Sequence, residues 1–170
     1  MKYKVFVDGQ EGTTGLKIHE YLAKRDDLEV LYIDSDNRKD VAARRALLNE
    51  ADVVFLCLPD SAARESVPLV SNNKTCIIDT STAHRIDSNW TYGLPELNKN
   101  HREMIRNSYR VAVPGCYATG FIVSLNPLVK EGIVPKEYHI ASSAVSGYSG
   151  GGKKLIEWYK TSHFINLNSP

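Results

Sequence analysis

Apolar residues along the first half of the chain follow two spacings in alternation. Short, nearly continuous apolar runs, typical of buried strands, are separated by segments in which apolar residues recur every three or four positions, as on one face of a helix. The runs predict strands at residues 3–7, 28–33, 53–58 and 75–78, and the segments between them predict helices at residues 14–24, 41–48 and 61–70. This order predicts an α/β fold with a doubly wound, parallel, Rossmann-like sheet.

From about residue 79 the pattern changes. A loop-rich stretch leads to a predicted helix at 98–106, a strand at 109–113, a helix at 116–130 that Pro127 bends or shortens, a strand at 138–145 and a short helix at 153–160. We therefore expect a dinucleotide-binding domain over residues 1–113. Residues 114–170 are expected to begin an α+β catalytic or dimerisation domain.

Composition removes several classes of protein. The chain has 170 residues with a formal net charge of +1, which argues against a dedicated nucleic-acid binder. No apolar run approaches the ~18–20 residues that a membrane span needs, and no signal peptide is visible. The three cysteines have no metal-ligand spacing and are odd in number, so we expect no metal and a reducing, cytoplasmic location.

Glycines are concentrated between the first predicted strand and helix. Gly9, Gly12 and Gly15 form G-x-x-G-x-x-G, with Thr13 and Thr14 at the start of the helix. Glycines at such a turn let backbone N–H groups approach a pyrophosphate at the helix N-terminus. The spacing departs from the standard G-x-G-x-x-G, so the motif alone leaves a turn without a ligand as an alternative.

The loop after the second strand bears on the choice of dinucleotide. Asp34 stands where an acidic residue holds the ribose of NAD, whereas Ser35 and Arg38 are suited to the 2′-phosphate of NADP. Lys39 is interpreted as part of a solvated loop. Both cofactors therefore stay open at this point.

Cys116 lies at the junction of a predicted strand and a predicted helix. The dipole and free N–H groups of a helix N-terminus stabilise a thiolate, which is the nucleophilic form of cysteine. Cys57 and Cys76 fall inside apolar strand patterns, where a buried, inert thiol is expected. Cys116 is accordingly the candidate nucleophile.

Five segments in this order resemble the short type of N-acetyl-gamma-glutamyl-phosphate reductase. They are residues 9–15 (GQEGTTG), 56–59 (LCLP), 92–96 (YGLPE), 114–119 (PGCYAT) and 146–152 (SGYSGGG). The resemblance extends from the first strand to the last helix.

The resemblance implies reduction of an acyl phosphate, N-acetylglutamyl 5-phosphate, by NADPH to the 5-semialdehyde, with release of phosphate, in arginine biosynthesis. Cys116 would form the thioester intermediate of this reaction. The resemblance favours NADP(H). Apolar surface expected at residues 121–129 and 138–145 of an unfinished second domain predicts a homo-oligomer, and the composition predicts no nucleic acid or membrane as partner. The cofactor-binding residues that the resemblance implies are Gly9, Gly12, Thr13, Thr14, Gly15, Ser35, Arg38, Leu58, Pro59, Ser146 and Gly147.

The segment after the fourth strand is the candidate substrate loop. Ser81 and Arg85 are the expected ligands of the substrate's phosphate or carboxylate, because a guanidinium matches such oxyanions. His84 is the one histidine near this loop and the only one to test as an acid or base. His19 and His101 are predicted at the surface, and His139 is predicted as a structural histidine in a strand.

The resemblance also implies a catalytic histidine further along than residue 170. We therefore expect residues 1–170 alone to bind NADP(H) weakly or not at all and to lack substantial reductase activity. Three alternatives remain open: another acylating enzyme such as aspartate-semialdehyde dehydrogenase, a nucleotide-binding module without chemistry, and a thiol hydrolase.

Overall fold

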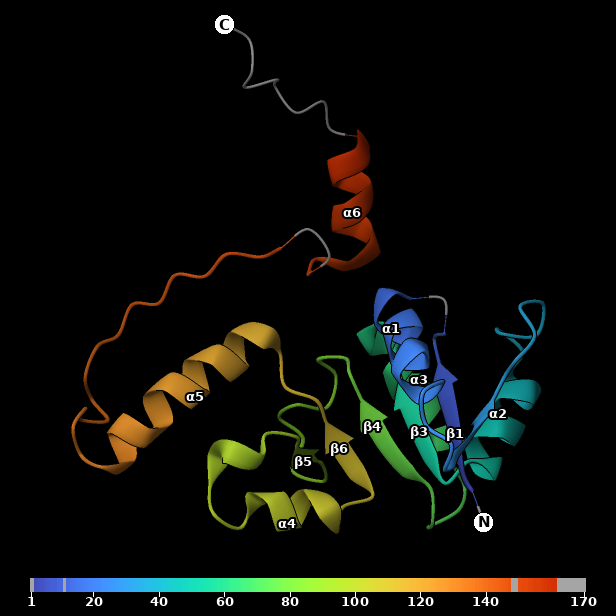
Figure 1. The fold of residues 1–170 in the computed structure, drawn as a ribbon, viewed down its shortest axis with the longest axis horizontal. Helices are drawn as coiled ribbons and strands as arrows, with labels where there is room; N and C mark the ends of the chain where they lie inside the picture. Colours follow the sequence, from blue (N-terminus) through green and yellow to red (C-terminus); the bar gives the residue numbers. More distant parts are fainter. Residues whose placement is uncertain (1, 11, 148–149, 162–170) are drawn as a thin grey trace, which may run out of the picture.

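A computed structural model describes residues 2–10, 12–147 and 150–161 of the chain, and six parallel strands form its central sheet (Figure 1). The order across the sheet is β2-β1-β3-β4-β6-β5, so the order in which the strands are added reverses between β1 and β3. The predicted α/β class and the parallel, doubly wound sheet are confirmed. The strands are β1 (Tyr3–Asp8), β2 (Leu28–Leu31), β3 (Val53–Leu56), β4 (Cys76–Asp79), β5 (Thr91–Tyr92) and β6 (Arg110–Ala112).

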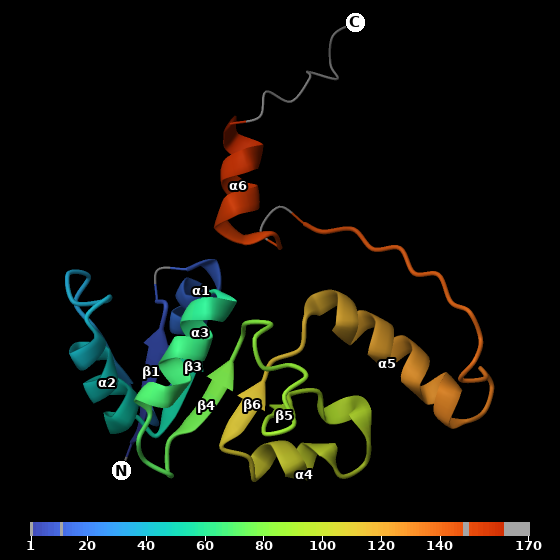
Figure 2. The same ribbon diagram turned by 180° about the vertical axis from the view of Figure 1, so that it is seen from behind.

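Helices pack on both faces of this sheet (Figures 1 and 2). One face carries α1 (Thr13–Leu22), and the opposite face carries α2 (Val41–Glu50) and α3 (Asp60–Ser66). Asp40 caps α2 by accepting a hydrogen bond from the N–H of Ala43 at 2.7 Å. The connecting elements are η1 (Val67–Leu69), η2 (Pro95–Leu97) and α4 (His101–Arg106).

The best-buried core lies between the sheet and the α2–α3 face. Phe6, Val54, Leu56 and Ile77 of the central strands pack there with Leu48 of α2, and all five are 0% exposed. Burial of such side chains stabilises the fold by about 1.5–3 kcal/mol each. This rigid core fixes the carboxyl ends of β1, β3 and β4, where the candidate site lies.

The chain leaves the sheet after β6 through a long helix, α5 (Cys116–Lys130), which projects away from the sheet (Figure 1). Asn126 donates to the carbonyl of Leu97 at 3.1 Å, and Lys130 also donates to it, so η2 holds the distal half of α5. The helix continues through Pro127, so this proline does not shorten it. The last helix is α6 (Gly152–Thr161).

The predicted strand at residues 138–145 is wrong. These residues adopt no regular structure and pair with no strand in the described part of the chain. An apolar, β-branched run forms a strand only where a neighbour accepts its backbone hydrogen bonds. The run instead leaves large apolar side chains exposed, among them Tyr138 and Val145.

Two predicted histidine environments are also wrong, and one strand was missed. His101 is buried, and its Nε2 lies 2.6 Å from the carbonyl oxygen of Tyr92, whereas His139 is exposed. His19 is half-buried against Tyr32, and both of its ring nitrogens are buried with no hydrogen-bond partner among the residues that the structure describes. The two-residue strand β5 is too short to show a periodic pattern. Within the described ranges, no helix is long and apolar enough to cross a membrane.

Candidate active site

The glycine turn follows β1, at the point where the order of the strands across the sheet reverses. Gly9 has φ +92°, which favours glycine, and a Cβ there would stand 2.3 Å from the carbonyl oxygen of Cys57. A Cβ on Gly15 would stand 2.4 Å from the carbonyl oxygen of Gly9. Both positions therefore admit only glycine, and the turn lies directly against the end of β3. A doubly wound sheet binds its ligands at this kind of switch point.

A pocket of about 440 Å³ opens beside this turn. Gln10 spans its wall, because its amide N–H donates to the carbonyl of Ile33 at 3.0 Å, just after β2. The amide oxygen of Gln10 is buried without a partner among the described residues. A buried acceptor beside a glycine cradle fits a ligand that carries hydroxyl or amine donors, as a dinucleotide does.

The pocket collects several of the sequence-predicted cofactor residues and adds others. Gly9, Gly12, Arg38, Leu58 and Pro59 line it. Ser35 is exposed and is not among the lining residues. Residues that the sequence did not single out also line the pocket, namely Asp8, Gln10, Ile33, Lys39, Arg44, Cys57 and Ala62.

A buried ion pair lies under the pocket. The guanidinium of Arg44 on α2 donates to both carboxylate oxygens of Asp8, at 2.7 and 3.3 Å, and also to the hydroxyl of Ser66 on α3. Asp8 is the last residue of β1, so this pair ties the strand that leads into the glycine turn to two helices. The pattern of apolar residues gave no signal for it.

Cys116 lines a different pocket from Gln10. Cys116 is the first residue of α5, it is exposed, and Gly115 caps the helix with φ −75° and ψ 153°. It lines a groove of about 730 Å³ with Thr14 and Ile18 of α1. The cysteine therefore lies where the helix dipole and free N–H groups favour an anion.

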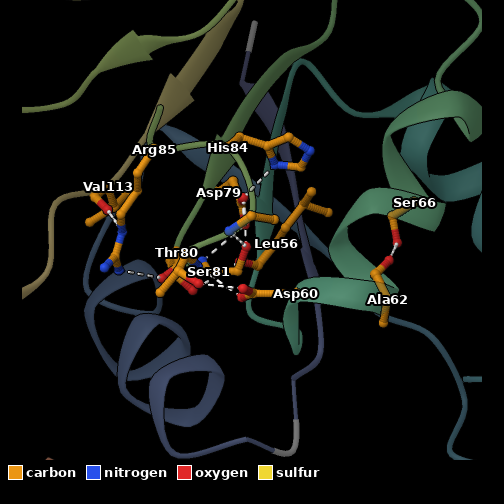
Figure 3. Close-up of polar contacts among 12 residues, drawn as sticks. Leu56, Asp60, Ala62, Ser66, Asp79, Thr80, Ser81, His84, Arg85 and Val113 are labelled. Atoms are coloured by element: carbon orange, nitrogen blue, oxygen red, sulfur yellow. Dashed lines mark hydrogen bonds and ion pairs between the residues drawn. The ribbon is translucent and has the colours of Figure 1, made fainter. Parts of the chain in front are cut away.

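Arg85 reaches the same groove from the loop after β4 (Figure 3). Its Nε donates to the carbonyl of Val113 at 2.9 Å, and Nη2 donates to the carbonyl of Thr80 at 3.3 Å. Nη1 packs beside Gly115 and has no hydrogen-bond partner among the described residues. A guanidinium held by two carbonyls and free at Nη1 is suited to an oxyanion next to Cys116.

Ser81 does not present its hydroxyl to the groove. The hydroxyl donates to Oδ2 of Asp79 at 2.7 Å and accepts from the N–H of Ala83 at 3.1 Å. His84 lies on the same carboxylate, with Nδ1 2.7 Å from Oδ2, and stacks on Trp90 at 4.2 Å. Asp79, Ser81 and His84 are all buried.

The remaining predicted residues fall into two groups. Thr14 lines the Cys116 groove, whereas Ser146 and Gly147 are exposed and line a separate cavity of about 710 Å³ that also includes Cys116. Thr13 begins α1, and Gly15 is buried in the first turn of this helix. The structure thus collects the glycine turn, Arg85 and Cys116 at one edge of the sheet.

The three thiols differ in their surroundings. Burial raises the pKa of the Cys57 thiol to about 11, because a hydrogen bond with Thr80 offsets only part of the loss of solvation. Burial also raises the pKa of Cys76. Both thiols stay protonated near neutral pH, in agreement with the prediction that they are inert. Within the described residues, no group of three or more His, Cys, Asp or Glu side chains is placed to hold a metal ion.

Comparison with known proteins identifies the family. Residues 4–105 match the family model described as the NAD binding domain of semialdehyde dehydrogenase. The chain belongs to the semialdehyde dehydrogenase family. Residues 116–169 match the dimerisation domain of the same family. The glycine turn and its pocket lie in the first match, and Cys116 is the first residue of the second.

Curated semialdehyde dehydrogenase relatives support the resemblance found in the motifs. The chain is 51% identical over 162 residues to N-acetyl-gamma-glutamyl-phosphate reductase 2 of Nostoc sp., covering 95% of this chain and 50% of the relative. It is 50% identical over 159 residues to the N-acetyl-gamma-glutamyl-phosphate reductase of Mesorhizobium japonicum, covering 94% of this chain and 52% of the relative. The chain therefore spans about half the length of the curated relatives it matches.

Solved structures confirm the fold of a semialdehyde dehydrogenase. Aspartate semialdehyde dehydrogenase from Francisella tularensis superposes with a TM-score of 0.64 at 17% identity, covering 91% of this chain and 47% of the other. Aspartate semialdehyde dehydrogenase II from Vibrio cholerae, complexed with ASA, gives 0.63 at 16% identity, covering 92% of this chain and 50% of the other. At these identities the likeness concerns the fold alone.

Proposed function

We propose that this chain forms the cofactor-binding and nucleophile-bearing part of an NADPH-dependent reductase of N-acetylglutamyl 5-phosphate. One observation supports the proposal most strongly: Cys116 lines one groove with Arg85, whose Nη1 has no hydrogen-bond partner among the described residues. An acyl phosphate offers an electrophilic carbon and a phosphate leaving group. A thiolate and a cation side by side match these two parts.

Cys116 performs the first half of the reaction. Its thiolate attacks the acyl carbon, the sulfur–carbon bond forms, and phosphate leaves with the electron pair of the broken carbon–oxygen bond. Arg85 stabilises the departing phosphate through Nη1, while its other two nitrogens stay fixed to Val113 and Thr80. The resulting thioester would be reduced by the hydride chemistry that a reduced dinucleotide, held at Gly9 and Gly12, would supply. Cys116 then leaves as a thiolate, and the semialdehyde is released.

The pocket beside the glycine turn is the proposed dinucleotide site. Gly9 and Gly12 would let the pyrophosphate approach the backbone of the turn closely, and Leu58 and Pro59 would border the cofactor at the end of β3. Arg38 and Lys39 line the same pocket, so two cations support the 2′-phosphate of NADP over the ribose diol of NAD. Ser35 stays a proposed ligand from the loop, although it does not line the pocket.

Pairing of two copies through the second domain is part of the proposal. Apolar side chains on α5 and on the following extended segment are exposed, and these residues lie within the segment that matches the dimerisation domain. An apolar face of this kind is buried in a homo-oligomer. The exposed residues are Tyr117, Phe121, Val123, Leu128, Tyr138, Ile140 and Val145.

The choice of acyl phosphate rests on the relatives. Those at about 50% identity are named N-acetyl-gamma-glutamyl-phosphate reductases, whereas the aspartate semialdehyde dehydrogenases resemble this chain only in fold. A reduction assay that compares N-acetylglutamyl 5-phosphate with aspartyl phosphate decides between them. The assay uses an extended chain, in which these residues are continued by the C-terminal half of the Mesorhizobium japonicum reductase. Preference for aspartyl phosphate would overturn the proposed substrate.

A further inference from the structure

The loop between β4 and Arg85 is built around one buried carboxylate. Oδ1 of Asp79 accepts from the N–H of Ser81 at 3.0 Å, and Oδ2 accepts from the Ser81 hydroxyl at 2.7 Å. The same Oδ2 lies 2.7 Å from Nδ1 of His84. The side chain of Asp79 therefore holds the loop at Ser81 and again at His84. Asp79 itself is fixed, because its carbonyl accepts from the N–H of Val113 at 2.8 Å.

The imidazole of His84 is buried and held by two neighbouring side chains. It is 6% exposed, it stacks on Trp90 with ring centroids 4.2 Å apart and an interplanar angle of 12°, and Nδ1 points at Asp79. His84 is not among the residues lining the Cys116 groove, whereas its neighbour Arg85 is. The two side chains leave the backbone in different directions, His84 toward Asp79 and Arg85 toward Val113 and Thr80 (Figure 3). This geometry excludes His84 as the acid or base of a reaction at Cys116.

We infer that His84 is a positioning residue: its Nδ1 bond to Asp79 fixes the backbone from which Arg85 reaches the phosphate site beside Cys116. The inference rests on the proposed function, because it takes phosphate as the anion that Arg85 binds. A residue that holds a ligand in register acts on binding of that ligand, since small displacements of a charged group weaken its contact with an oxyanion. Loss of the bond therefore raises the KM for phosphate more than it lowers kcat.

A second contact restricts the outer side of the loop. The N–H of Thr82 donates to Oδ1 of Asp60 at 2.9 Å, and its hydroxyl donates to Oδ2 of the same carboxylate. This contact is exposed and fixes the middle of the loop to the start of α3. The N–H of Arg85 donates to the carbonyl of Thr82 at 3.5 Å, so this contact bears on Arg85 from the outer side of the loop, whereas the buried His84–Asp79 bond holds the loop from the core side.

Two substitutions of His84 distinguish the effect of its hydrogen bond to Asp79 from the effect of the size of its side chain. His84→Asn places an amide N–H near the position of Nδ1 and keeps the bond, whereas His84→Gln places the amide near Nε2 and loses it. The extended chain is assayed in the reverse direction, with semialdehyde, NADP⁺ and varied inorganic phosphate. We expect His84→Gln to raise the KM for phosphate about tenfold with a smaller change in kcat, and His84→Asn to stay within about twofold of wild type.

His101→Asn is the matched control. It removes an equally buried histidine contact, from Nε2 to the carbonyl of Tyr92, outside the groove. It is expected to lower the midpoint of thermal unfolding and to leave the KM for phosphate within about twofold of wild type. If His84→Gln does not fold, His84→Phe replaces it, because phenylalanine keeps the stack on Trp90 and lacks the donor.

The outcomes distinguish this inference from the proposed function. An active wild type in which His84→Gln leaves the KM for phosphate unchanged, or in which Asn and Gln raise it equally, overturns the inference alone. A wild type without reductase activity overturns the proposed function. In that case calorimetric titration of inorganic phosphate into the same variants still tests the positioning role, with the same expected order of affinities.

Discussion

Nη1 of Arg85 packs against Gly115, the residue that precedes the proposed nucleophile, so closely that a methyl group on Gly115 would stand 2.8 Å from it. Nε and Nη2 of the same guanidinium are held by Val113 and Thr80. The anion-binding side chain and the start of α5 thus share one tightly packed junction. The absence of a side chain at residue 115 is what lets the cation approach Cys116.

Gly115→Ala is expected to displace the guanidinium and raise the KM for phosphate about tenfold in the extended chain, because Nη1 must move to admit the new methyl group. The reverse reaction with varied phosphate measures this. Gly120→Ala is the control, since a Cβ there meets nothing within 4 Å. It should stabilise α5 by up to about 1 kcal/mol and leave the KM unchanged. Equal effects of both substitutions on the KM would contradict the packing argument.

Alkylation should distinguish the three thiols. At pH 8 a thiol with a pKa of about 11 is ionised in only about one molecule in a thousand, so Cys57 reacts slowly, whereas exposed Cys116 reacts first. Iodoacetamide labelling followed by peptide mass spectrometry should show Cys116 modified at least about tenfold faster than Cys57. Labelling of Cys57 should increase as the pH rises toward 11. Parallel labelling of both at pH 8 would refute the difference in their surroundings.

Removal of Arg44 is expected to destabilise the chain by about 3–5 kcal/mol, because Arg44→Met leaves the buried carboxylate of Asp8 without its cation and with only the hydroxyl of Ser66 as a side-chain donor. Urea unfolding measures this, and adding Asp8→Asn should restore much of the lost stability. Arg25→Met is the control, since Arg25 and Asp27 form an exposed pair whose loss should matter far less. A small effect of Arg44→Met would mean that water reaches the pair.

Arg38 is expected to determine the preference for NADP. In the extended chain, Arg38→Ala should raise the KM for NADPH about tenfold and leave the KM for NADH nearly unchanged, because only NADPH carries the 2′-phosphate. Ser35→Ala should have the smaller effect, since Ser35 lies outside the pocket lining. A larger effect of Ser35→Ala than of Arg38→Ala on the KM for NADPH would indicate that the 2′-phosphate binds at the loop around Ser35 instead.

Local spacing was sufficient to predict the framework of the sheet. Apolar runs marked β1, β2, β3, β4 and β6, of which all but the edge strand β2 contain buried residues, and Gly9 and Gly15 mark contacts that no side chain could enter. The segment at 138–145 carries the same apolar signal, but strand formation depends on a neighbouring strand that its own sequence does not encode.

The site was predictable in its residue types and unpredictable in its contacts. Cys116 and Arg85 could be singled out by their position after a strand. Ser81 binds Asp79 and faces away from the groove because of the path of its loop, which the sequence does not show. Arg44 reaches Asp8 through a tertiary contact between residues far apart in the sequence. Gln10 gave no sequence signal because its significance lies in a buried, unpartnered oxygen.

The central claim is tested most directly by the initial rate of NADPH formation from N-acetylglutamate 5-semialdehyde, NADP⁺ and phosphate, compared between the extended chain and its Cys116→Ser variant. We expect phosphate-dependent turnover that falls by at least about a thousandfold in the variant, and no substantial activity from residues 1–170 alone. Turnover that persists in Cys116→Ser would contradict the account.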